Sequence, residues 1–113
     1  MVKILSEHNR YDGMLSGVCL YEGKICWFSC RHMKDIFIPR TYRVFELSKI
    51  DQFRIRLGDW IFEKIVRKLI VTFPRGYGKI HKIYGFLYKN LFSIKSENDL
   101  KIIGAFNENE YYR

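Results

Sequence analysis

Residues 16–30 read SGVCLYEGKICWFSC, and this stretch decides how the chain begins to fold. Two runs of strand-forming residues flank the dipeptide Glu22-Gly23, where glycine accepts the positive φ that a two-residue turn needs. The pattern predicts an antiparallel hairpin in a register that sets Cys19 opposite Cys26. Since both faces of this hairpin are apolar, we expect it to lie in the centre of a sheet.

Outward from the hairpin, the pattern predicts further strands at residues 1–5, 41–47 and 101–106, and a tail at 107–113. Ser48 fits a helix N-cap, and a helix is expected at 49–69 because apolar residues then recur at steps of three and four. These residues are Ile50, Phe53, Leu57, Trp60, Ile61, Ile65 and Leu69. We expect this apolar side to face the core.

The expected fold class is therefore α+β, with a small antiparallel sheet and one long amphipathic helix packed on it. A chain of 113 residues, 48% of them hydrophobic, is predicted to form a single domain over 1–113. No signal peptide and no apolar stretch long enough to span a membrane is recognised, so we expect a cytoplasmic protein without a membrane partner.

The charge of the chain is concentrated in one segment. From Lys64 to Ser96 there is no acidic residue, whereas elsewhere basic and acidic residues cancel, so the whole formal charge of +8 lies in this segment. Aromatic residues alternate with the cations there. A positive field beside aromatic faces predicts a polyanionic partner, either DNA or RNA or an acidic protein surface.

Within this segment, residues 74–82 (PRGYGKIHK) are predicted to form a basic, glycine-containing loop that holds phosphate groups, with an ordinary solvated loop as the alternative. The loop lacks the spacing of a P-loop. A helix is favoured over a strand at 83–91. The predicted binding residues are Arg67, Lys68, Arg75, Tyr77, Lys79, His81 and Lys82.

Three chemical alternatives compete with this binding surface. His81, as a neutral imidazole among cations, would suit a general base in phosphodiester cleavage. Cys26, Cys30 and His32 have a C-x3-C-x-H spacing, but a straight strand would separate the two sulfurs by roughly 13 Å, which resists a shared zinc ion. Cys30 is the one candidate nucleophile. We expect free thiols, no metal and no cofactor.

Residues 11–18 (YDGMLSGV), 21–24 (YEGK) and 27–28 (WF) resemble the opening of a family of short phage and mobile-element proteins. The family pattern runs D-G-P-L-S-G, and Met14 replaces its proline. Residues 42–48 and 103–106 resemble later parts of the pattern, whereas 64–95 do not match. The resemblance covers about half of the chain and implies no activity. It supplies a context in which small phage proteins bind and block host machinery.

The sequence therefore predicts a non-enzymatic binding protein, phage-borne and anti-defence (anti-CRISPR-like), that blocks a host protein or nucleic-acid-processing complex. In that setting it would act in the host cytoplasm. A DNA- or RNA-binding module and a small nucleotide- or phosphodiester-acting enzyme are the alternatives. A homodimer formed through exposed aromatic rings is a further alternative.

Overall fold

The computed structural model describes residues 1–10, 13–30, 40–94 and 96–113. The chain divides into two compact units, a sheet unit (1–48 and 96–113) and a helical unit (49–95). The α+β class is confirmed. The single domain, and the packing of a helix on the sheet, stay predictions. Residues 11–12, 31–39 and 95, which include His32 and the first two residues of the family-like stretch at 11–18, lie outside the described residues.

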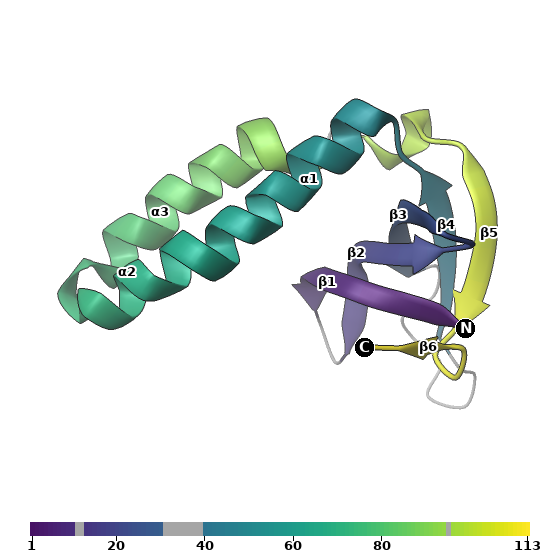
Figure 1. Cartoon of the computed structure of the whole chain (residues 1–113), viewed down its shortest axis with the longest axis horizontal. Coiled ribbons are helices and arrows are strands. Elements are labelled where there is room, and N and C mark those ends of the chain that lie inside the picture. The colour runs from purple at the N-terminus through teal and green to yellow at the C-terminus, as the bar shows by residue number, and fades with distance from the viewer. Residues whose placement is uncertain (11–12, 31–39, 95) are drawn as a thin grey trace. The chain divides into compact units, whose positions relative to one another are not determined.

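The sheet has six strands in the order β5-β4-β3-β2-β1-β6 (Figure 1). Their bounds are β1 (Val2–Arg10), β2 (Met14–Tyr21), β3 (Lys24–Cys30), β4 (Thr41–Glu46), β5 (Ile102–Asn107) and β6 (Tyr111–Tyr112). All neighbours are antiparallel except β6, which pairs parallel with β1. The expectation of a small antiparallel sheet is thus right only in part. The predicted tail is wrong at 111–112, because these residues add a strand.

The hairpin of β2 and β3 has the predicted register and the predicted central position. Cys19 is the Cα partner of Cys26. The turn residues Glu22 and Gly23 have φ of 48° and 78°, and Gly23 takes up this left-handed backbone without steric cost. The turn chemistry and the alternation of apolar residues together were sufficient to fix this element.

The core of the sheet unit is built around aromatic side chains on one face of the sheet. The rings of Phe28, Tyr42 and Phe106 are buried, with centroids 5.0 to 5.7 Å apart. The hydroxyl of Tyr42 donates to the carbonyl of Met14 at 2.9 Å. Burial raises the pKa of Tyr42 to about 12. A buried ring with a satisfied hydroxyl fixes the position of its strand as well as filling space.

The helical unit is a hairpin of two helices rather than the one long helix expected. The first consists of α1 (Lys49–Ile61), a π-turn (Phe62–Val66) and α2 (Arg67–Thr72). A 3₁₀ turn (Pro74–Gly76) then leads into α3 (Tyr77–Leu87), which ends in a second π-turn (Tyr88–Phe92) and runs back beside α1 and α2 (Figure 1). Among the described residues, no helix has the length and apolar character needed to cross a membrane.

The two helices pack through residues spaced four apart. These are Phe62, Val66 and Ile70 on one side and Ile80, Tyr84, Tyr88 and Phe92 on the other, all buried or half-buried. On a regular α-helix a spacing of four drifts by about 40° per step, so the side chains would rotate out of the contact. A π-turn takes in one extra residue and removes this drift. The two π-turns therefore help to keep these side chains on the sides where the helices meet.

The apolar side predicted to face the core is largely exposed. Phe53 and Trp60 keep 68% and 54% of their surface accessible. The first helix instead buries a different side, with Ile55, Gly58 and Val66. Within the helical unit, α3 instead takes up the side that carries Gly58, whereas packing of the apolar side on the sheet stays a prediction.

Candidate binding surface

The excess of basic over acidic residues lies entirely in one of the two units. The helical unit has eleven basic and three acidic residues, whereas the sheet unit has nine of each. The entire formal charge of +8 therefore belongs to residues 49–95, and the sheet unit is formally neutral. The excess of positive charge therefore lies on the helical unit alone.

The three acidic residues of the helical unit each pair with an arginine on the same helix. Asp51 lies 2.6 Å from Arg54, and Glu63 lies 2.7 Å from Arg67. The third pair, Arg56 with Asp59, is longer at 3.4 Å. Among the described residues, no acidic side chain lies within ion-pair distance of the cations at 68–89. The positive field is therefore strongest over α2 and α3.

All seven predicted binding residues are exposed and lie around the turn that joins the two helices. Arg67 and Lys68 are on α2, Arg75 is in the 3₁₀ turn, and Tyr77, Lys79, His81 and Lys82 are on the first turns of α3. We call residues 67–82 the hairpin tip. The structure thus brings the predicted residues to one end of the helical unit.

Residues 74–82 form a 3₁₀ turn and the start of a helix and not the loop that was predicted, whereas phosphate binding by these residues stays a prediction. Helix α3 begins at Tyr77, so successive side chains are about 100° apart around its axis. Tyr77 and His81 share one side, with ring centroids 4.3 Å apart, whereas Lys79 points to the opposite side. The loop prediction was wrong because glycine at 76 and 78 favours a loop by composition, although a helix tolerates both residues at its start.

Side chains, and not backbone dipoles, supply the field of the hairpin tip. The negative end of α2 and the positive end of α3 meet there, so their macrodipoles largely cancel. The backbone N–H of Phe73 donates to Leu69 at 2.8 Å, and that of Gly76 donates to Phe73 at 2.9 Å. These two N–H groups are therefore engaged within the turn itself.

The outer face of α3 carries a feature that the sequence analysis missed. Ile83 and Phe86 are 63% and 67% exposed, although both are large and apolar. Lys79, Lys82 and Lys89 lie at helical spacings around them and are also exposed. The recurrence of this set at steps of three and four was the available signal. We call these five residues the α3 face.

Two of the three cysteines are buried in the sheet, and the third, Cys30, is half-buried. Cys19 and Cys26 are buried on neighbouring strands, and desolvation by burial raises the pKa of Cys19 to about 12. Desolvation also raises the pKa of Cys26. Among the described residues, none of the three cysteines is part of a disulfide. His32, the remaining member of the proposed zinc spacing, lies outside the described residues. Across the described ranges, no three His, Cys, Asp or Glu side chains cluster as metal ligands would.

The catalytic alternative gains no support from the surroundings of His81. The carboxylates of the helical unit all lie between Asp51 and Glu63, each beside an arginine. None of them belongs to α2, the 3₁₀ turn or α3, where His81 lies. No carboxylate of the helical unit is therefore placed in the same element as His81 to orient it or to act as a second acid or base. Catalysis by His81 therefore stays a prediction.

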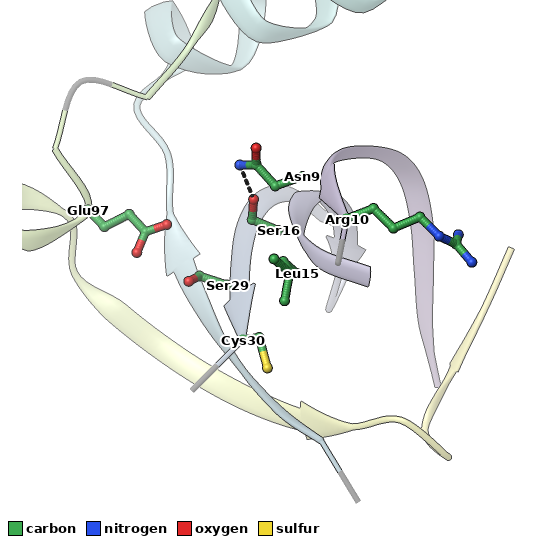
Figure 2. A pocket seen from close by; sticks show the side chains of 7 residues that line it. All are labelled: Asn9, Arg10, Leu15, Ser16, Ser29, Cys30 and Glu97. Carbon is green, nitrogen blue, oxygen red and sulfur yellow. Dashed lines mark hydrogen bonds between the residues drawn. The ribbon is translucent and has the colours of Figure 1, made fainter. Parts of the chain in front are cut away.

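The sheet unit has a shallow cavity of about 360 Å³ (Figure 2). It is lined by Asn9, Arg10, Leu15, Ser16, Ser29, Cys30 and Glu97. Three of its polar side chains are engaged within the protein, because the Asn9 amide donates to Ser16 at 2.8 Å and the Trp27 indole donates to Glu97 at 2.9 Å. Arg10 pairs with Glu7 at 3.2 Å.

No family model matches this chain, and no curated protein and no solved structure is significantly similar to it. The resemblance of the hairpin segment to phage and mobile-element proteins accordingly stays a prediction.

Proposed function

We propose that this chain is a non-enzymatic binding protein whose helical unit occupies an acidic surface of a partner protein. The observation that carries the proposal is the separation of charge, with +8 on the helical unit and zero on the sheet unit. The sheet unit then serves as a stable base, and the hairpin tip and the α3 face make the contact. Arg75, Lys79 and Lys82 are the cations we assign to it.

The α3 face favours a protein over a nucleic acid as the partner. Protein interfaces combine a central apolar or aromatic anchor with a charged rim. Phe86 and Ile83 would be the anchor, and the three lysines around them would be the rim. An exposed isoleucine has no counterpart in phosphate recognition, which uses cations, N–H groups and hydroxyls.

The biological role that fits this contact is inhibition. A small protein that covers an acidic patch needs no chemistry of its own to block a larger complex. The resemblance of residues 11–28 to phage and mobile-element proteins is a second ground for this role. We therefore propose that the chain is a phage-borne inhibitor of a host defence or nucleic-acid-processing complex and acts in the host cytoplasm.

Heparin, a generic polyanion, provides a test that does not require the partner. The double variant R75E/K79E lowers the formal charge from +8 to +4, and so does the control K24E/K101E in the sheet unit. All four side chains are exposed, so both proteins should fold. We expect R75E/K79E to elute from heparin at clearly lower salt than the control. Equal elution of the two variants would show that only net charge matters and would refute the assigned surface.

A nucleic-acid-binding module is the second candidate, and one observation favours it. Tyr77 is 53% exposed beside His81, and such a ring can stack on a base. Titration of labelled DNA and RNA at low and physiological salt distinguishes the two functions. Tight binding with a steep salt dependence would support the module. Weak binding at both salt concentrations is the result that our proposal predicts.

A further inference from the structure

The first helix of the helical unit carries a second exposed surface, distinct from the α3 face. Its large apolar side chains form a row along α1 and α2, which we call the α1 stripe. The members are Ile50, Phe53, Leu57, Trp60, Ile65 and Leu69, with exposed fractions between 37% and 73%. Exposed apolar residues are ordinary when scattered, whereas a continuous patch marks an interaction surface.

The π-turn makes the α1 stripe continuous. The first four members follow steps of three and four, but Trp60 and Ile65 are five apart. On a regular α-helix this step would turn Ile65 about 140° away from the row. The π-turn at Phe62–Val66 takes in one extra residue and returns Ile65 and Leu69 to the same side. The row therefore runs over 20 residues, or about 30 Å.

The size of the α1 stripe suits a symmetric pair of copies. Six side chains of these types and exposures present on the order of 600 Å², at the upper limit of the apolar patches found on monomers. Placing the stripe against itself across a twofold axis would bury about 1,200 Å², the lower end of specific protein interfaces. The stripe is thus large enough to be its own partner.

The distribution of charge along the helical unit permits this contact in one orientation. Residues 49–66 have four basic and three acidic side chains and are nearly neutral, whereas residues 67–95 have seven basic and none acidic. Two copies can therefore approach along 49–66 without strong repulsion. An antiparallel pairing keeps the two hairpin tips apart, whereas a parallel pairing would bring like charges together. We propose that the chain forms an antiparallel homodimer through the α1 stripe.

Two double variants can be compared because the side chains that they remove have similar exposed fractions. Phe53 on the stripe and Phe86 on the α3 face are 68% and 67% exposed, and Trp60 and Ile83 are similarly accessible at 54% and 63%. The double variants F53A/W60A and I83A/F86A thus remove comparable exposed surface from opposite helices. Alanine has the higher helix propensity, so neither variant should weaken its helix. Circular dichroism verifies that both are folded.

Sedimentation equilibrium between roughly 1 and 200 µM covers the range expected for an interface of this size. We expect a concentration-dependent dimer for the wild type, at least about tenfold weaker dimerisation for F53A/W60A, and a change within about twofold for I83A/F86A. A wild type that stays monomeric throughout this range overturns the proposal. So does a dimer that both variants weaken equally.

Discussion

Gly58→Ala tests the packing of the helical hairpin. On helix propensity alone this change should stabilise α1 by about 1 kcal/mol. However, a Cβ built on Gly58 would lie 2.5 Å from Cβ and 2.7 Å from Cγ of Phe92. Carbon atoms in contact prefer about 3.5 to 4.0 Å, and Cβ of a buried side chain cannot move without its backbone. Overpacking of this kind costs about 1–3 kcal/mol, which outweighs the gain in propensity.

We therefore expect Gly58→Ala to lower the free energy of unfolding by up to about 2 kcal/mol. Gly85→Ala on α3 is the matched control, because nothing lies within 4 Å of the position that its new methyl group would take. That change should be stabilising by up to about 1 kcal/mol. Urea unfolding followed by helical circular dichroism gives both values. A Gly58→Ala protein as stable as Gly85→Ala would refute the close helix crossing.

Two further predictions concern the sheet unit. Burial raises the pKa of the Cys19 thiol from 9.0 to about 12. Above pH 9 the unfolded chain therefore loses a proton that the folded chain keeps, so the free energy of unfolding should fall between pH 9 and about pH 12. Cys19→Ala should make this fall less steep by up to about 1.4 kcal/mol per pH unit, measured as urea midpoints against pH. Glu97→Ala should cost about 1–3 kcal/mol, because the buried indole N–H of Trp27 loses its acceptor, whereas Asp99→Ala in the same short turn should change thermal unfolding little.

The sheet unit was predictable where local chemistry and pattern agree. Glu22-Gly23 specified the turn, and alternation specified the register of β2 and β3. The β6 strand was not predictable, because two tyrosines after a turn give no periodic signal. Its pairing with Val2 depends on a contact between the two ends of the chain.

In the helical unit, less of the structure could be predicted from the sequence. The start and most of the length of the first helix follow from Ser48 and the apolar periodicity. The basic segment was misread because glycine and proline at 74–78 indicate a loop, whereas they form a short turn and a helix start. Periodicity also cannot tell which of two apolar sides of a helix is buried when a second helix competes for it.

The central claim is that the helical unit, and not the sheet unit, binds polyanionic surfaces. Its most direct test is to map backbone amide chemical shifts by NMR while a heparin hexasaccharide is added to the full chain. We predict that the largest changes fall on the hairpin tip and the α3 face, including Arg75, Lys79 and Lys82. Changes centred on the strands of the sheet unit, or spread evenly over both units, would contradict the account.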